Sequence, residues 1–293
     1  MPPLKLKSPA KLNLYLRIIG KRPDGYHNIV TLFERIGLFD EITLVQRKTG
    51  GIGVVCSNSK VPKGPKNLAY KAAKALLDYT GKRLSCRVII KKHIPVAAGL
   101  GGGSSNAATA LIGLNRLWRL GLSKKELLSL GSKIGADVNF FLSDSSFAIG
   151  RGRGEQCSPL HIKRRLWHIV IYPGKGLSTK DIYHYWDNMC NTENSLTQAH
   201  ADVKILLRLI RNNNLTLLAK SLHNDLEEPA AVEDRTILKI KELLKSSGTA
   251  RAAMSGSGSC VFGIALSAKE AARIKKKLTR LKREWQIFTV KTI

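Results

Sequence analysis

A glycine-rich segment near the middle of the chain constrains the fold more than any other feature of the sequence. It covers residues 95–108 and reads Pro-Val-Ala-Ala-Gly-Leu-Gly-Gly-Gly-Ser-Ser-Asn-Ala-Ala. Glycine lets the backbone approach a ligand closely and turn several N–H groups inward. The apolar spacing that follows predicts a helix beginning at Ser104 and Ser105, and a helix N-terminus attracts anions. The segment therefore predicts a phosphate-binding loop; the competing interpretation is a flexible turn with a serine N-cap.

The two common phosphate loops do not match this segment. A Walker A loop requires a lysine after its last glycine, and no lysine follows Gly103. A dinucleotide fingerprint requires a third glycine, but counting from Gly99 or Gly101 places Ser104 or Asn106 at that position. The loop must therefore belong to another class of phosphate-binding protein.

Hydrophobic patterns along the chain predict a mixture of strands and helices. Residues 11–19 alternate apolar and polar side chains, which is typical of a half-buried strand, and a capping box over residues 123–126 begins a helix that ends at Gly135. The patterns predict strands at residues 11–19, 29–36, 41–47, 52–56, 84–92, 166–172, 260–266 and 285–293, and helices at residues 67–81, from 104 through 114, at 123–135, over most of 178–246 and after 269. Because the order lacks a strict βαβ rhythm, we expect an α+β fold rather than a doubly wound parallel sheet.

The chain is long enough for two domains. Its 293 residues, 43% of them hydrophobic, can bury one large core or two modest ones. The composition changes after the glycine–arginine stretch at residues 150–154, where a proline and a basic segment follow. We therefore predict an N-terminal domain of residues 1–155 and a C-terminal domain of residues 156–293.

The net charge of +28, from 49 Lys and Arg against 21 Asp and Glu, points to an anionic partner. Nucleic acid, an anionic membrane and phosphorylated small molecules all satisfy it. Residues 269–291 hold nine basic side chains interleaved with apolar ones at helical spacing. We interpret this segment as an amphipathic helix with a solvated basic face; the alternative is a polyanion-binding arm. A basic nucleic-acid-binding protein remains the alternative from another class, although RNA-recognition, helix-turn-helix and zinc-finger signatures are absent from the sequence.

The sequence shows no pattern typical of a membrane segment, a disulfide framework or a zinc site. No run approaches eighteen apolar residues, and the first residues lack the pattern of a signal or transit peptide. Five scattered cysteines without a CxxC pair predict reduced thiols in a cytoplasmic protein. The seven histidines form no HExxH motif or zinc-like cluster with these cysteines. We expect no membrane partner and no zinc site.

Three motifs in order along the chain resemble those of the GHMP kinases, the family of galactose, homoserine, mevalonate and phosphomevalonate kinases. The first is Ser-Pro-Ala-Lys-Leu-Asn-Leu at residues 8–14, the second is the glycine-rich loop, and the third is Met-Ser-Gly-Ser-Gly-Ser-Cys-Val-Phe-Gly at residues 254–263. Together they span nearly the whole chain. The resemblance implies a two-domain GHMP kinase-like fold with the active site in the cleft between the domains.

The segment Gly-Lys-Arg-Pro-Asp-Gly-Tyr-His at residues 20–27 narrows the resemblance within the family. It is similar to that of members which transfer phosphate from ATP to the 2-hydroxyl of a cytidylylated methylerythritol, in the non-mevalonate route to isoprenoid precursors. Residues 135–138 and 152–155 are also similar to their pattern. Homoserine and mevalonate kinases lack the Asp-Gly-Tyr-His sequence, so another metabolite kinase of this family is the alternative within the class. The resemblance implies ATP and Mg²⁺ as cofactors, no nucleic acid, and a monomer or weak dimer.

The catalytic and ATP-binding residues follow from the matched motifs. Asp137 matches the catalytic aspartate, which accepts the substrate hydroxyl proton, and Lys11 matches the lysine beside it, which stabilises the transferred phosphoryl group. Taken alone, Asp137 would be a solvated loop residue and Lys11 an exposed strand residue. Ser104 or Ser105 would help to hold Mg²⁺. The implied ATP-binding residues are Asn67, Pro95, Val96, Ala97, Ala98, Gly99, Leu100, Gly101, Gly102, Gly103, Ser104 and Ser105.

The resemblance also implies the residues that bind the cytidylyl substrate. Tyr26 and Tyr183 would stack on the two faces of the cytosine ring, and His27 would contact its polar edge. Thr179 opens the segment that carries Tyr183, and Asn13 would hydrogen-bond the methylerythritol part. The alternative interpretations are a turn histidine for His27 and a buried helix position for Tyr183. Arg151 and Arg153 add charge that the family pattern does not require.

Overall fold

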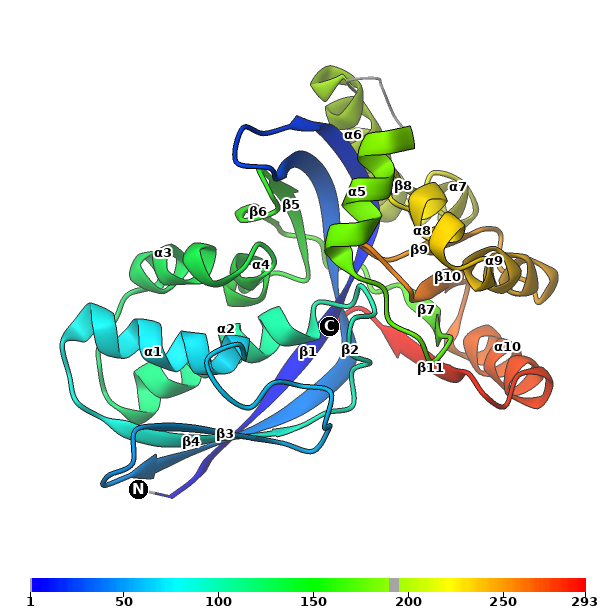
Figure 1. The fold of residues 1–293 in the computed structure, drawn as a ribbon. Helices are drawn as coiled ribbons and strands as arrows, with labels where there is room; N and C mark the ends of the chain where they lie inside the picture. Colours follow the sequence, from blue (N-terminus) through cyan, green and yellow to red (C-terminus); the bar gives the residue numbers. More distant parts are fainter. Residues whose placement is uncertain (1, 190–194) are drawn as a thin grey trace.

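Two sheets organise the protein, and the computed structural model describes residues 2–189 and 195–293. Within these residues one sheet has seven strands and the other has four (Figure 1). The strands of the first sheet are β1 (Leu4–Lys21), β2 (His27–Arg47), β3 (Ile52–Cys56), β4 (Ser85–Lys91), β5 (Phe147–Arg151), β6 (Gln156–Leu160) and β8 (His223–Asn224). Those of the second are β7 (Trp167–Tyr172), β9 (Ala252–Met254), β10 (Val261–Ala265) and β11 (Gln286–Lys291).

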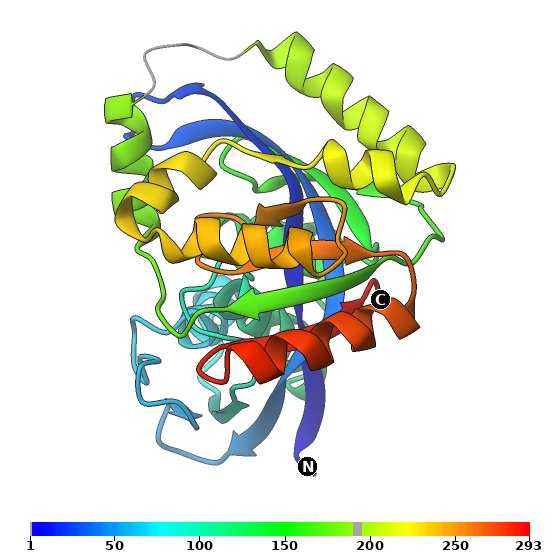
Figure 2. The same ribbon diagram turned by 90° about the vertical axis from the view of Figure 1, so that its right-hand side faces the viewer.

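Helices cover both sheets and fill the connections. The first half contains α1 (Leu68–Thr80), α2 (Gly102–Leu117), α3 (Lys124–Ile134) and α4 (Val138–Leu142). The second half contains α5 (Thr179–Met189), α6 (Leu196–Arg211), α7 (Leu215–Lys220), α8 (Glu227–Glu233), α9 (Thr236–Ser246) and α10 (Ala268–Leu281). Figure 1 shows α1–α4 on one side of the first sheet, and Figure 2 shows α9 and α10 in front of the second sheet. The predicted α+β class is confirmed.

β1 and β2 form a long antiparallel hairpin that is the backbone of the first sheet. The two strands pair from Leu4 opposite Leu44 to Lys21 opposite His27, with register shifts along the way. The prediction of two separate strands at residues 29–36 and 41–47 was wrong, because β2 runs through both. Asp40, a polar residue in the gap, is buried in an ion pair, so this position lies inside the strand and forms no turn.

The prediction of a half-buried strand at residues 11–19 was also wrong, because both faces of β1 are covered. On one face, Leu12 and Tyr15 are buried in the same core cluster with residues of α6, because a register shift between Asn13 and Tyr15 turns Tyr15 to the side of Leu12. On the other face, Lys11 and Asn13 are buried. The Asn13 N–H donates to the Ser255 hydroxyl at 3.2 Å, so this polar face is held between the two halves of the chain rather than in solvent.

Two short strands from the second half of the chain, β6 and β8, join the first sheet. Residues 178–246 are mainly helical, as predicted, but the short strand β8 pairs in parallel with β1 at Tyr15 and Leu16. β6 also joins the first sheet beside β5. Hydrogen bonds thus cross the expected division at residues 155 and 156, and the exact boundary stays a prediction.

The basic helix predicted after residue 269 is α10. Its buried side is formed by Ala271, Ile274 and Leu278, while Leu281 is 56% exposed. Two of the apolar residues that recur at helical spacing in this segment, Ala272 and Leu281, are exposed and lie outside the buried face. The lysines and arginines lie on the remaining surface, in agreement with a solvated basic face.

Four of the five cysteines lie in the described part of the chain and are free thiols: Cys56, Cys86, Cys157 and Cys260. Cys190 lies outside the described residues. Burial raises the pKa of Cys86 to about 11 and that of Cys157 to about 12. The absence of a disulfide among these four described cysteines agrees with the sequence prediction of reduced thiols.

Candidate active site

The glycine-rich segment forms the connection between β4 and α2. The helix begins at Gly102, two positions earlier than predicted, because Gly101 serves as the N-cap with a φ of 68°. A Cβ on Gly101 would lie 3.0 Å from both the Cγ of Lys11 and a ring carbon of Phe141. The early N–H groups of α2, at Gly102, Gly103 and Ser104, therefore face the start of the loop, where an anion can bind.

The third motif packs directly on this loop. Gly99 has a φ of 73°, and a Cβ there would lie 1.8 Å from the carbonyl oxygen of Ser255. The Ser255 hydroxyl donates to the Gly99 carbonyl at 2.9 Å, and the Cys260 N–H donates to the Ala98 carbonyl at 3.2 Å. Residues far apart in the sequence thus form a single wall, and glycine is required for their approach.

Lys11 and Asp137 meet beside this wall. The Nζ of Lys11 lies 3.7 Å from Oδ2 of Asp137, and the Lys11 N–H donates to the Leu100 carbonyl at 3.0 Å. The lysine side chain is 4% exposed and the aspartate side chain 28%. Burial lowers the pKa of Lys11, and the charge of Asp137 opposes that shift. A buried ammonium group is therefore held next to a carboxylate that solvent can reach.

The local backbone leaves the Asp137 carboxylate available. α3 ends at Gly135, and Asp137 lies at the N-cap position of α4 with αR backbone angles. Its side chain makes no capping hydrogen bond to α4. A Cβ built on Gly154 would lie 3.7 Å from Oδ1 of Asp137, so the glycine leaves space at that oxygen. The carboxylate can accept a proton from a group on its open side.

Asn13 positions Lys11. Its Oδ1 accepts a hydrogen bond from the Lys11 ammonium group, and its Nδ2 donates to Thr31 at 2.8 Å. Its backbone N–H donates to the Ser255 hydroxyl at 3.2 Å. The side chain is buried and joins the first and third motifs. Direct contact between Asn13 and a methylerythritol group stays a prediction.

The two serines at the start of α2 have different surroundings. The Ser105 hydroxyl is fully buried and accepts from the Ser8 hydroxyl at 2.8 Å. The Ser104 side chain is partly exposed, and a Cβ built on Gly135, two residues before Asp137, would lie 3.7 Å from its Oγ. Of the two sequence candidates for a metal or phosphate contact, Ser104 is therefore the better placed.

Asn67 has a capping role. Its Oδ1 accepts from the Ala69 N–H at 2.8 Å, and its Nδ2 donates to the Pro62 carbonyl at 2.6 Å. The side chain is buried at the start of α1. These contacts explain why an asparagine begins this helix. A contact between Asn67 and ATP stays a prediction.

The aromatic residues expected to bind cytosine surround the end of the β1–β2 hairpin. His27 stacks on Tyr183 of α5, with ring centroids 4.9 Å apart and an interplanar angle of 25°. Tyr26 is 56% exposed, and the guanidinium of Arg153 lies 5.0 Å from its ring centroid. The hydroxyl groups of Thr179 and of Ser257 in the third motif share a hydrogen bond, with their oxygens 2.8 Å apart. Tyr183 thus faces His27 here, and the sandwich between Tyr26 and Tyr183 stays a prediction.

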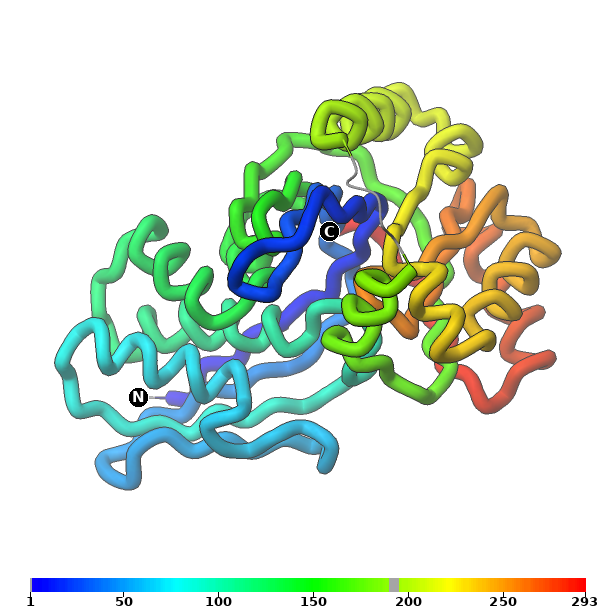
Figure 3. Tube along the Cα trace, turned by 45° about the horizontal axis from the view of Figure 1, so that its top comes forward, coloured from blue at the N-terminus to red at the C-terminus, as the bar shows by residue number. Residues whose placement is uncertain are grey.

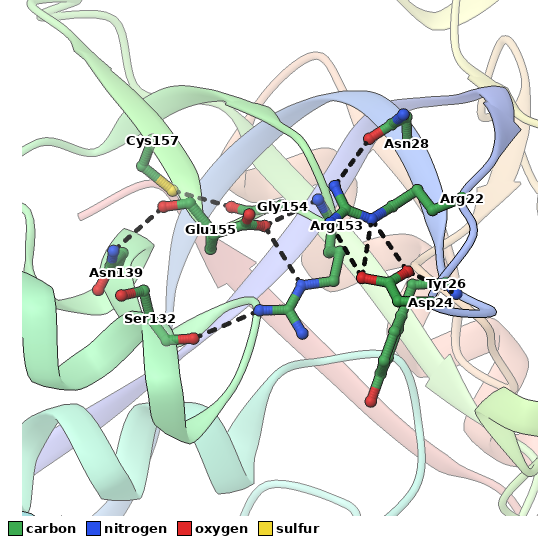
Figure 4. A network of polar contacts seen from close by, with 10 residues as sticks. All are labelled: Arg22, Asp24, Tyr26, Asn28, Ser132, Asn139, Arg153, Gly154, Glu155 and Cys157. Atoms are coloured by element: carbon green, nitrogen blue, oxygen red, sulfur yellow. Dashed lines mark hydrogen bonds and ion pairs between the residues drawn. The ribbon is translucent and has the colours of Figure 1, made fainter.

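Sequence reasoning noted Arg153 as surplus charge, but the structure gives it definite contacts. Figure 4 shows Arg153 between the hairpin turn and the loop at Glu155. The Arg153 N–H donates to Glu155 at 2.7 Å, and the guanidinium reaches the Ser132 carbonyl at 3.5 Å. In the same view Arg22 pairs with Asp24 at 2.9 Å and stabilises the turn before Tyr26. The exposed tyrosine is therefore supported on one side by a fixed cation.

A buried ion pair beside the first turn of α2 was not predicted from the sequence. Lys92 lies 2.5 Å from Asp40, and a Cβ on Gly102 would lie 2.9 Å from the lysine nitrogen. Asp40 also accepts from Asn106 at 2.9 Å. These contacts hold the first turn of α2 in place from the inner side. The only signal in the sequence was a polar residue between two apolar runs.

The described residues contain neither a membrane-spanning helix nor a cluster of metal-ligating side chains. None of their helices is both long and apolar enough to cross a membrane. Among the same residues, His, Cys, Asp and Glu nowhere gather in threes in a way that could hold a metal ion.

Models of known protein families match a segment in each half of the chain. The family model for the GHMP kinases N terminal domain matches residues 67–145, and the model for the GHMP kinases C terminal domain matches residues 206–283. Together they cover more than half of the chain. The protein therefore belongs to the GHMP kinases, and the predicted enzyme class and two-domain fold are confirmed.

Full-length relatives narrow the class. A 4-diphosphocytidyl-2-C-methyl-D-erythritol kinase from Geobacter sp. is 37% identical over 100% of both chains, and one from Moorella thermoacetica is 40% identical over 95% of both. A crystal structure of 4-(cytidine 5'-diphospho)-2C-methyl-D-erythritol kinase has a TM-score of 0.78 at 30% identity, covering 98% of this chain and 99% of that one. Within the GHMP kinases, the chain belongs to the 4-diphosphocytidyl-2-C-methyl-D-erythritol kinases.

Proposed function

We propose that this enzyme transfers the γ-phosphoryl group of ATP to the 2-hydroxyl of 4-diphosphocytidyl-2-C-methyl-D-erythritol. The observation that carries the proposal is the ion pair of Lys11 and Asp137 beside the glycine loop, at a separation of 3.7 Å. Phosphoryl transfer asks a protein to position the reactants and neutralise charge, and this site has groups for both tasks. The names of the full-length relatives supply the substrate.

Asp137 acts as the general base in this proposal. Its carboxylate takes the proton from the substrate 2-hydroxyl as that oxygen forms a bond to the γ-phosphorus. The bond between the γ-phosphorus and the bridging oxygen breaks at the same time, and ADP leaves with the electron pair. The exposed side of the carboxylate and the space beside Gly154 support this assignment.

Lys11 stabilises the charge of the transferred group. Its ammonium is held by Asn13 and by Asp137, so it does not have to reorganise during the reaction. Because the side chain is buried, its field is less screened than that of a surface lysine.

The glycine loop binds the phosphates of ATP. The N–H groups at the start of α2 and its dipole favour negative charge there. Mg²⁺ fits a site of this type, because it binds few protein oxygens and takes the rest from phosphates and water. Ser104 and Asp137 are the residues that could contact it, and the ion would neutralise phosphate charge. Pro95 through Gly103 would line the nucleotide.

The cytidylyl group would bind at the end of the β1–β2 hairpin. Tyr26 presents an exposed ring that Arg153 supports from one side, and Tyr183 lies across from the same turn on α5. His27 and Thr179 complete this wall. In this arrangement the base would stack on Tyr26, and its stacking on Tyr183 stays a prediction. A cytoplasmic location and a monomer or weak dimer stay predictions.

Product analysis tests the proposal. The purified enzyme, Mg-ATP and 4-diphosphocytidyl-2-C-methyl-D-erythritol are incubated, and the product is examined by phosphorus NMR. We expect stoichiometric ADP and a new phosphomonoester coupled to the carbon that carries the 2-hydroxyl. Absence of ADP release, or phosphate on another hydroxyl, would contradict the assignment.

A further inference from the structure

A three-residue cluster joins the hairpin to α5 at the proposed cytosine site. Lys21 and His27 face each other as register partners at the end of β1 and β2. Asp187 of α5 accepts from both of them: its Oδ2 lies 2.7 Å from Nζ of Lys21, and its Oδ1 lies 2.7 Å from Nε2 of His27. Figure 3 shows the hairpin end, in dark blue, beside α5. One carboxylate thus connects the two halves of the chain.

α5 holds the imidazole of His27 on several sides. Tyr183 stacks on it at 4.9 Å, and Trp186 contacts its edge at 5.4 Å with an interplanar angle of 82°. Tyr183, Trp186 and Asp187 are three and four residues apart, so they share one face of the helix. His27 is 6% exposed. Its ring orientation is therefore determined by α5 and not by the hairpin alone.

The cluster also determines which ring nitrogen carries a proton. Burial raises the pKa of Asp187, but hydrogen bonds from Lys21 and His27 outweigh it and hold that pKa below its ordinary value. The ionised carboxylate can only accept, so Nε2 of His27 must be the N–H donor. In a neutral imidazole the other nitrogen, Nδ1, is then an acceptor.

We propose that Asp187 is a positioning residue that makes His27 select cytosine over uracil. Cytosine presents an amino group at C4, a donor that an acceptor Nδ1 can bind, whereas uracil presents a carbonyl oxygen there, which an acceptor repels. A site with a mismatched buried polar group rejects the wrong base strongly. This inference rests on the proposed function, because it requires the cytidylyl group to bind beside His27.

The test compares kcat/KM for the cytidylyl substrate and for its uridylyl analogue. Wild type should favour cytidine on the order of 10²-fold or more. Asp187→Asn lets the amide donate to Nε2 and so permits the opposite tautomer. We expect it to lower this preference by at least ~10-fold, through KM for the nucleotidyl substrate with KM for ATP unchanged. Asp181→Asn is the matched control, since Asp181 is an exposed acid on the same helix.

A spectroscopic measurement separates tautomer control from a purely structural effect. In protein labelled with ¹⁵N-histidine, the His27 signals should show protonated Nε2 and unprotonated Nδ1 in wild type and in Asp181→Asn. In Asp187→Asn they should shift toward protonated Nδ1. An unchanged base preference in Asp187→Asn, or an unchanged tautomer, would overturn the inference while leaving kinase activity intact. Failure of wild type to phosphorylate either substrate would instead overturn the proposed function and this inference with it.

Discussion

Asn13 accepts a hydrogen bond from the ammonium group of Lys11, and this contact fixes the lysine 3.7 Å from Asp137. Both residues lie on the same face of β1, and that face is covered by the loops at Gly99 and Ser255. The Lys11 ammonium group is thus buried, whereas the Asp137 carboxylate stays accessible to solvent. The arrangement places a fixed cation and an accessible carboxylate together, as phosphoryl transfer requires.

Removal of the carboxylate charge at Asp137 should abolish most turnover. We expect Asp137→Asn to lower kcat on the order of 10²–10⁴-fold, because the amide cannot accept the substrate proton. KM for ATP should change little. Steady-state kinetics measure both values. Asp144→Asn is the matched control, since Asp144 is 94% exposed and pairs with a surface lysine. Near-normal kcat in Asp137→Asn would remove the general-base role.

The pH dependence should report Lys11. Burial lowers the pKa of Lys11 from 10.5, so the ammonium form is lost at a lower pH than in an ordinary lysine. Activity that needs this ammonium is complete below that pKa and falls as pH rises through it. Asp137 opposes the shift, so the loss of kcat/KM should begin below pH 10.5 and move lower still in Asp137→Asn, measured on its residual rate. An alkaline limb at or above 10.5 would contradict this.

Two glycines with the same backbone conformation separate strain from close packing. Gly99 and Gly121 have φ values of 73° and 72°, but a Cβ would meet Ser255 at 1.8 Å in the first case and nothing within 4 Å in the second. Gly121→Ala should lower the free energy of unfolding by about 1 kcal/mol through strain alone. Gly99→Ala should cost about 1–3 kcal/mol more and raise KM for ATP. Denaturant unfolding measures both free energies. Equal losses in the two variants would show that close packing of Gly99 on Ser255 does not contribute to stability.

Loss of the Tyr26 ring should weaken the cytidylyl substrate selectively. Stacking of a base on an aromatic ring contributes roughly 1–3 kcal/mol, so Tyr26→Ala should raise KM for that substrate on the order of 10-fold or more. KM for ATP should stay within about twofold. Tyr79→Ala serves as the control, because Tyr79 is 53% exposed on α1 in the first half. A parallel rise of both KM values would argue against a stacking role.

The three motifs and their order along the chain predicted the fold class and most of the proposed site. Glycine spacing was informative because a side chain at Gly99 or Gly101 would press against another segment of the chain. Those contacts are tertiary, so the start of α2 at Gly102 could not be read from a serine N-cap pattern. The continuity of β2 was missed for a related reason, since the burial of Asp40 beside Lys92 is also a tertiary contact.

Contacts between the two halves were the part that sequence reasoning missed. Asp187 lies on α5 and reaches Lys21 and His27 only because the helix packs against the hairpin end. No local pattern marks such a residue. The net charge of +28 was a broad indicator of phosphate. Part of the excess lies on the exposed surface of α10.

The choice among alcohol substrates is the best test of the proposed kinase activity. The purified enzyme is given Mg-ATP with 4-diphosphocytidyl-2-C-methyl-D-erythritol, mevalonate or homoserine in parallel, and kcat/KM is measured for each alcohol. We expect efficient phosphoryl transfer to the cytidylyl substrate. The kcat/KM values for mevalonate and homoserine should be lower by on the order of 10³-fold or more, since neither alcohol can stack on Tyr26 or reach His27. Faster transfer to mevalonate or homoserine would contradict it.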